Sequence, residues 1–347
     1  MSPTLTSLRP CTSAELVQAI AGTDFRSCAV TIVGMGGMGA QFVQAARALG
    51  VRRLRLVSRS ATQLAPFQGQ DGITCISSGI ERFAEAPQPD ELAVVATPIA
   101  LLAPAAERLA SLGFRHLLIE KPVALGAAAI EQLAARFEAQ GVEAACAYNR
   151  AAYPSVVEAR VRIEQEGGAT SCAYAFTEMI KPDWPQRFSA EELARWGIAN
   201  SLHVMSVAHA LIGVPAAWSG QRAGSLPWHP TGAVFVGSGV SERRIPFSYH
   251  ADWGSTGRWS VEAHTRASSY RFCPLETLSR RVSAVGEWSD VPVEAFAPQV
   301  KTGIVEELAA MLSPEIRARV PLPSLRSTAA LTRYGESVFG YDAAEGA

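Results

Sequence analysis

Three glycines near the N-terminus have the spacing of a phosphate-binding turn. The pattern Gly34-x-Gly36-x-x-Gly39 follows a β-branched run, residues 30–33, and precedes a helix-like stretch over 41–49. In such a unit the first glycine permits a tight turn, the second lets the backbone approach a dinucleotide pyrophosphate, and the third lets the helix pack on the strand. The helix N-terminus then presents free N–H groups to the anion. We expect a dinucleotide on Gly34, Met35, Gly36, Gly37, Met38 and Gly39, and the alternative is a glycine-rich turn of another α/β protein.

The end of the next expected strand, 54–57, distinguishes between cofactors. An NAD site usually has Asp or Glu here, which binds the ribose 2′-hydroxyl. This chain has Ser58-Arg59 instead, and Ser with Arg is able to bind a 2′-phosphate that a carboxylate would repel. The pair favours NADP(H), with NAD(H) as the alternative if Arg59 is only a solvated surface residue.

A lysine and a histidine are candidates for proton transfer. Lys121 follows the expected strand 116–119, at the edge where ligands of parallel sheets bind. Partial burial beside a nicotinamide would lower the pKa of this lysine toward useful acid–base values, whereas the alternative is a loop lysine paired with Glu120. His203 shares a helix face with Asn200, three residues earlier. Asn200 could instead be a helix N-cap, and a lone histidine is often a packing residue.

A sheet face in the second half of the chain could hold a polyhydroxylated ligand. Glu178, Tyr249 and Arg258 lie in or beside strand-like stretches in which aromatic and polar residues alternate. The alternative is a set of ordinary strands with one buried face.

The order of expected elements predicts two domains. Up to residue 150, strands alternate with helices, which predicts a doubly wound parallel sheet. After residue 150, strand-like stretches follow one another with few helices between them, which predicts an antiparallel or mixed sheet. We expect an α/β protein with a nucleotide-binding domain at 1–150, including a helix over 4–22, and a substrate and oligomerisation domain at 151–347. We further expect the last helix, 323–339, to pack back on the first domain.

Composition excludes several classes of function. The chain has 347 residues, 48% of them hydrophobic and 18% charged, and a net charge of −1, so no basic surplus points to nucleic acid or an anionic membrane. No apolar run is long enough to span a bilayer, and residues 1–10 do not resemble a secretion signal. The six cysteines are scattered without metal-ligand spacing, which favours a reduced, cytoplasmic protein without a structural metal. An open second sheet would be covered by another subunit, so we expect a homodimer or homotetramer.

Five segments together resemble the Gfo/Idh/MocA oxidoreductase family. They are the glycine turn, Ala96-Thr97-Pro98, Glu120-Lys121-Pro122, Tyr148-Asn149-Arg150 and the His203 segment. The resemblance implies a Rossmann domain, a second α/β domain on a large open and mostly antiparallel sheet, and hydride transfer between nicotinamide and a sugar, an inositol or a related ligand. It makes Lys121 the main proton-transfer candidate and His203 the second. It places Thr97, Pro98, Glu120 and Asn149 near the cofactor. Arg150, which follows an expected strand at the ligand edge, is a candidate substrate residue.

Beyond residue 150 the chain carries Phe176-Thr-Glu178, Asn200-Ser-x-His203-Val and Phe247-Ser-Tyr-His-Ala-Asp-Trp253. In these segments it is similar to a subgroup associated with surface-polysaccharide and nonulosonic-acid gene clusters. One departure stands out, because the family pattern has Asp four residues before the histidine and this chain has Ala199. The expected reaction is oxidation or reduction of a sugar or a nucleotide-activated sugar in cell-surface glycan synthesis. Either Lys121 and His203 suffice for it, or Asn200 binds substrate in another way. The alternatives are a redox-neutral epimerase or lyase with retained cofactor, an imine reductase, and a non-catalytic dinucleotide sensor.

Overall fold

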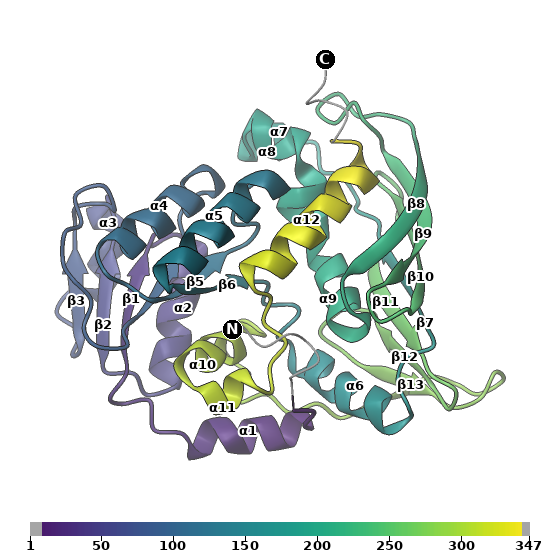
Figure 1. Ribbon diagram of the computed structural model, residues 1–347, viewed down its shortest axis with the longest axis horizontal. Coiled ribbons are helices and arrows are strands. Elements are labelled where there is room, and N and C mark those ends of the chain that lie inside the picture. Colours follow the sequence, from purple (N-terminus) through teal and green to yellow (C-terminus); the bar gives the residue numbers. More distant parts are fainter. Residues whose placement is uncertain (1–8, 342–347) are drawn as a thin grey trace.

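The computed structural model describes residues 9–341 and contains two sheets (Figure 1). The first sheet is built from six parallel strands in the order β3-β2-β1-β4-β5-β6. The strands are β1 (Ala29–Val33), β2 (Arg53–Val57), β3 (Ile73–Ile76), β4 (Leu92–Val95), β5 (His116–Glu120) and β6 (Glu143–Ala147). This is the Rossmann order, with the crevice for a dinucleotide beside β1 and β4 where the chain reverses direction across the sheet.

Helices cover both faces of the first sheet, which is why its central strands are apolar throughout. Every residue of β1 and of β4 is buried, as expected for parallel strands that are covered on two sides. The helices of this part are α1 (Ser13–Gly22), α2 (Gly37–Ala48), α3 (Ala61–Leu64), α4 (Ile99–Ser111) and α5 (Ala127–Gln140). The expected doubly wound parallel sheet is thus confirmed.

The second sheet has eight strands in the order β14-β13-β12-β11-β7-β10-β9-β8. Neighbours are antiparallel except for the parallel pair β7 and β10. The strands are β7 (Ser171–Phe176), β8 (Pro215–Ala223), β9 (Val234–Ser241), β10 (Pro246–Asp252), β11 (Trp259–His264), β12 (Ser269–Phe272), β13 (Ser279–Arg281) and β14 (Ser289–Asp290). The expected mostly antiparallel sheet is confirmed, but β8 had no expectation because its Trp-Ser-Gly-Gln-Arg run lacks the alternation of apolar and polar residues.

Helices lie on one face of the second sheet, and its other face carries no helix in Figure 1. The remaining helices are α6 (Pro154–Gln165), α7 (Trp184–Arg187), α8 (Ala190–Ala194), α9 (Leu202–Ile212), α10 (Ile304–Leu312), α11 (Pro314–Arg317) and α12 (Leu325–Phe339). α9 is buried along its whole length and packs on β7 and β11. Residues 246–251 of β10 alternate between exposed and buried, which is the pattern of a sheet covered on one side only.

The last helices return to the first sheet. α10 packs against α2, and α12 packs along α5 (Figure 1). An isolated bridge also joins Ala145 of β6 to Ser324, the residue before α12. The second half of the chain is therefore tied to helices α2 and α5 and to the edge strand β6 of the first sheet.

Two expected helices differ from the structure. The helix expected over 4–22 begins only at Ser13, and residues 1–8 lie outside the described part. Thr12 is its N-cap and forms a capping box with Glu15, so the local capping signal marked the true start. The helix expected from Asn200 is preceded by one π-helical turn, Gly197–Ser201, which runs directly into α9. Asn200 lies inside this turn, so the N-cap interpretation is wrong.

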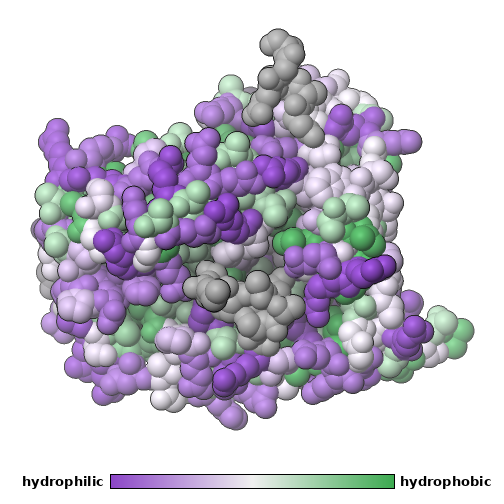
Figure 2. Space-filling model, in the orientation of Figure 1, coloured by the Kyte–Doolittle hydropathy of each residue, from purple (hydrophilic) through white to green (hydrophobic). Residues whose placement is uncertain are grey.

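The visible surface is largely hydrophilic over α4 and α5 (Figure 2). Within residues 9–341, no helix combines the length and the apolar character needed to cross a membrane.

Candidate functional site

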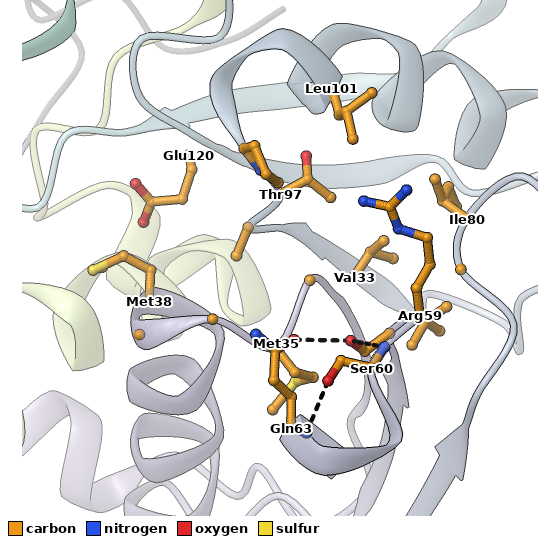
Figure 3. Close-up of a pocket in the computed structure, with 18 of the residues that line it drawn as sticks. Val33, Met35, Met38, Arg59, Ser60, Gln63, Ile80, Thr97, Leu101 and Glu120 are labelled. Atoms are coloured by element: carbon orange, nitrogen blue, oxygen red, sulfur yellow. Dashed lines mark hydrogen bonds between the residues drawn. The ribbon is translucent and has the colours of Figure 1, made fainter. Parts of the chain in front are cut away.

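A cavity of about 580 Å³ opens at the carboxyl edge of the first sheet. Figure 3 shows its two ends, with Arg59 and Ile80 at one end and Glu120 and Met38 at the other. Most of the predicted cofactor residues line it, namely Gly34, Met35, Gly36, Gly37, Met38, Ser58, Arg59, Thr97, Pro98, Glu120 and Lys121. Gly39 and Asn149 are not among the lining residues.

Each of the three glycines of the turn is required for a different physical reason. Gly34 has a φ of +93°, and a Cβ there would stand 2.5 Å from the carbonyl oxygen of Ala96. A Cβ on Gly39 would collide with the Gly34 carbonyl oxygen. Gly36 has ordinary extended angles, and apart from its two chain neighbours no heavy atom of residues 9–341 stands within 4 Å of a Cβ built there. Its missing side chain leaves open space in the cavity, which is the cradle that a pyrophosphate requires.

The polar groups facing this cradle suit an anionic dinucleotide. α2 begins at Gly37 with no side-chain cap and no acidic residue in its first turn, so its N–H groups and dipole are available to phosphate. The hydroxyl of Thr97 and one carboxyl oxygen of Glu120 are buried without a hydrogen-bond partner in the described part of the chain. Ligand atoms would satisfy both of them, because buried polar groups are rarely left unpaired.

Ser58 and Arg59 occupy the far end of the cavity. Ser58 is buried and its hydroxyl donates to Oε1 of Gln63 at 3.0 Å. Arg59 is exposed, and no residue between 9 and 341 holds its guanidinium by a hydrogen bond or ion pair. Figure 3 shows the guanidinium extended over the cavity toward Leu101. Glu81 lines the same end, so one cationic and one anionic side chain are both in reach of a ribose.

Lys121 occupies the other end and is held by a backbone oxygen. Its Nζ donates to the carbonyl oxygen of Ala199, in the π-helical turn, at 2.8 Å. Burial lowers the pKa of Lys121 to about 8, against the opposing effect of the Glu120 charge and with help from Arg150. Both protonation states are then accessible near neutral pH, which suits proton transfer.

His203 is buried beside this lysine. Its pKa is lowered well below the ordinary value by burial and by the charges of Lys121, Arg150 and Lys301. Nδ1 has no hydrogen-bond partner among the described residues. The ring meets the edge of Tyr148 at 5.8 Å and lies 6.3 Å from Trp259 between centroids. The imidazole is therefore neutral, with a nitrogen available to a ligand.

The predicted substrate residues are only partly brought together. Arg150 stacks over Trp259, with Cζ at 5.0 Å from the ring centroid, and so joins the Lys121 and His203 end. Tyr249 packs against Tyr174 and lines a different cavity beside β8 and α12. Arg258 is exposed in the β10–β11 loop. The expected shared sheet face is wrong, because Tyr249 belongs to the buried aromatic face of β10 while Arg258 precedes β11.

Three further predicted residues, Glu178, Asn200 and Asn149, make hydrogen bonds to other parts of the protein near the site. Glu178 accepts hydrogen bonds from Trp196, Asn200 and Ser201. Asn149 donates from Nδ2 to the carbonyl oxygen of Thr302 at 2.9 Å.

Sequence reasoning missed several cavity residues. Ile80 and Glu81 follow β3, and the rule that ligands bind at strand ends could have found them had it been applied to that short strand. Lys301 contacts Met38 through its Nζ at 3.2 Å, and nothing in its local sequence indicated this. The described residues hold no group of three or more His, Cys, Asp or Glu side chains suited to a metal ion.

Comparison with known proteins identifies the nucleotide-binding domain. Residues 28–148 match the family model GFO_IDH_MocA, described as an oxidoreductase family with an NAD-binding Rossmann fold. No curated protein matches the sequence.

Solved structures share the fold over almost the whole chain. Levoglucosan dehydrogenase in complex with NADH and L-sorbose is 17% identical, with a TM-score of 0.69 over 92% of this chain and 97% of that one. UDP-N-acetylglucosamine 3-dehydrogenase from Acidithiobacillus ferrooxidans is 13% identical, with a TM-score of 0.66 over 90% and 96%. An oxidoreductase from Agrobacterium radiobacter, in complex with NAD+, L-tartaric acid and magnesium, is 13% identical, with a TM-score of 0.72 over 93% and 97%.

Proposed function

We propose that this chain, whose residues 28–148 match the GFO_IDH_MocA family model, is an NADP(H)-dependent oxidoreductase acting on a sugar, with Lys121 as its proton-transfer group. The observation that carries the proposal is the position of Lys121. Its ammonium lies at one end of the dinucleotide cavity, and burial brings its pKa to about 8.

The residues around Lys121 fit carbonyl–alcohol chemistry. A nicotinamide supplies or accepts the hydride when the cofactor is bound. In reduction, protonated Lys121 donates a proton to the developing alkoxide. In oxidation, neutral Lys121 accepts the proton of the hydroxyl group. His203 is neutral, and its Nδ1, which has no hydrogen-bond partner in the described part of the chain, would hydrogen-bond the reacting or the adjacent hydroxyl group and orient the substrate.

The substrate class follows from the groups beside Lys121 and from similar proteins. Trp259 offers a ring for stacking, and Arg150 and Lys301 add positive charge. Solved structures with this fold include a levoglucosan dehydrogenase and a UDP-N-acetylglucosamine 3-dehydrogenase. We therefore favour a sugar or a nucleotide-activated sugar, in the synthesis of a cell-surface glycan.

NADP(H) is favoured by Arg59, which is exposed over the cavity and able to bind a 2′-phosphate. NAD(H) is the competing cofactor, since Glu81 at the same end could accept a ribose hydroxyl and a structural relative holds NADH.

We also propose the larger organisation. The nucleotide domain spans 1–150 and the substrate and oligomerisation domain 151–347. The uncovered face of the eight-stranded sheet would be buried in a homodimer or homotetramer in the cytoplasm.

A cofactor and substrate screen tests the proposal. Levoglucosan, myo-inositol and UDP-N-acetylglucosamine would be incubated with NADP+ or NAD+, and L-sorbose with NADPH or NADH, while nicotinamide absorbance is followed. We expect turnover of at least one sugar, faster with the phosphorylated cofactor. Binding of cofactor without turnover of any keto-sugar or polyol tested would contradict the proposal.

A further inference from the structure

Glu178 is the most heavily bonded carboxylate near the site. It lies two residues after β7 and only 7% of its surface is exposed. Its Oε2 accepts from Nε1 of Trp196 and from Nδ2 of Asn200, both at 2.9 Å, and its Oε1 accepts from the hydroxyl of Ser201 at 2.7 Å. Glu178 is not among the residues that line the dinucleotide cavity.

All three donors belong to one short segment. Trp196 directly precedes the π-helical turn, and Asn200 and Ser201 are its last two residues. Such turns strain the regular helix and are frequent at functional sites. The hydrogen bonds that this one carboxylate accepts from both ends of the segment fix the shape of the turn.

The same turn carries the partner of Lys121. Ala199 stands immediately before Asn200 and Ser201, and its carbonyl oxygen accepts from Nζ of Lys121 at 2.8 Å. Ala199 has no side chain able to contact the ammonium, so the lysine depends on the orientation of this backbone carbonyl. His203 follows two residues after Ser201 and begins the buried helix α9 with Leu202.

We propose that Glu178 is a positioning residue for Lys121. By accepting three hydrogen bonds from the segment of the π-helical turn, Glu178 aims the Ala199 carbonyl at the Lys121 ammonium. The charge of Glu178 stabilises that ammonium. The inference rests on the proposed role of Lys121 in proton transfer. Glu178 and Lys121 are linked through one short segment, because Lys121 Nζ donates to the Ala199 carbonyl oxygen at 2.8 Å and Glu178 accepts from the next two residues, Asn200 at 2.9 Å and Ser201 at 2.7 Å. The charge of Lys121 also acts on Glu178, since it opposes the burial that raises the pKa of the Glu178 carboxyl.

The other charged and titratable groups around Lys121 come from several elements. Glu120 precedes it on β5, Cys146 stands at the end of β6, Arg150 follows β6, Lys301 precedes α10 and His203 lies on α9. Of the two carboxylates, Glu120 has one oxygen without a hydrogen-bond partner among residues 9–341, whereas both oxygens of Glu178 accept hydrogen bonds. Glu178 is thus the anion whose position is fixed relative to the turn.

The chain offers a direct readout, because it contains three lysines, Lys121, Lys181 and Lys301. In protein labelled with ¹³C-lysine, the Cε signals would be titrated with and without NADP+, and the signal lost in Lys121→Met would be assigned to Lys121. Glu178→Gln keeps a side chain that can still accept from Trp196 and Asn200 and pair with Ser201, but removes the charge. Ser201→Ala is the matched control, since it removes one hydrogen bond and keeps the charge.

We expect Glu178→Gln to lower the pKa of Lys121 by more than the titration error and to move the matching limb of the kcat–pH profile in the same direction. The variant should lower kcat about tenfold, while the Kd for NADP+ changes less than about twofold. Ser201→Ala should shift both pKa readouts less than Glu178→Gln does, because it keeps the charge and two of the three hydrogen bonds. Glu178→Ala should lower kcat further, because it releases the turn.

The inference is overturned if Glu178→Gln titrates and turns over like the wild type while Lys121→Met is inactive. If Lys121→Met keeps full turnover, the proposed function fails instead, and the lysine titration still shows whether Glu178 sets the state of that ammonium.

Discussion

The two ends of the dinucleotide cavity are built in different ways. The glycine-turn end is formed by β1, the turn and α2, which are consecutive in the sequence. The Lys121 end is assembled from the end of β5, the π-helical turn and the segment before α10. The glycine-turn end is a backbone cradle shaped to bind an anion. The Lys121 end is a set of buried charged groups, each of which affects the protonation of the others.

This difference teaches where substitutions should act. At the glycine end, space is the critical quantity, because Gly36 has no neighbour within 4 Å of a built Cβ. At the lysine end, charge is critical, since Glu120, Glu307 and Lys121 are all buried or partly buried near each other. Variants that fill space at the glycine end should therefore change cofactor binding. Variants that remove charge at the lysine end should change stability and catalysis.

The largest effect is expected from filling the cradle. Gly36→Val should fold with a melting temperature near that of the wild type, because the backbone angles are ordinary and the space is open. It should weaken NADP+ binding at least about 100-fold, since the side chain would occupy the pyrophosphate position. Calorimetric titration and thermal unfolding measure the two quantities.

Gly39→Ala is the matched variant for that experiment. Its Cβ would collide with the Gly34 carbonyl, so it should lower the melting temperature as well as binding. If Gly36→Val bound NADP+ with wild-type affinity, open space at the glycine end would not be what cofactor binding requires, and the contrast between the two ends would be wrong.

A smaller effect is expected at the ribose. Arg59→Ala should weaken NADP+ binding about tenfold, because a charge-assisted hydrogen bond to phosphate is lost, and should leave NAD+ binding within about twofold. Arg52→Ala is the control, since Arg52 is exposed at the opposite end of β2 and lines a separate surface hollow. Equal losses for both cofactors, or a loss of NAD+ binding in Glu81→Gln alone, would favour NAD(H).

The smallest effect concerns stability at the charged end. Glu307 is fully buried, neither carboxyl oxygen has a partner in the described chain, and burial followed by the Glu120 charge raises its pKa well above the ordinary value. The folded state then holds a proton that the unfolded state releases above about pH 4.5, so this carboxyl costs stability increasingly as pH rises. Glu307→Gln should raise the melting temperature at about pH 8 by about 3 °C and have little effect at about pH 5.

The exposed Glu81 provides the control for that measurement, because Glu81→Gln should change stability at neither pH. A pH-independent gain in Glu307→Gln would assign its effect to packing instead of ionisation.

The comparison also explains what the sequence could predict. The glycine turn, the parallel sheet and the strand-end positions of Ser58 and Lys121 depend on local patterns, and the structure places them at one cavity. The Ala199 carbonyl could not be predicted, because it depends on a π-helical turn whose anchor, Glu178, lies 18 to 23 residues earlier. Tyr249 was misjudged because alternation reveals that a strand has two faces but not which face is buried.

The most direct test of the account is the turnover of Lys121→Met on a sugar that the wild type converts. With NADP+ affinity within about twofold of wild type, the account predicts that kcat falls at least about 100-fold, because a positioned acid–base group contributes that much. Full turnover by Lys121→Met with cofactor bound would contradict it.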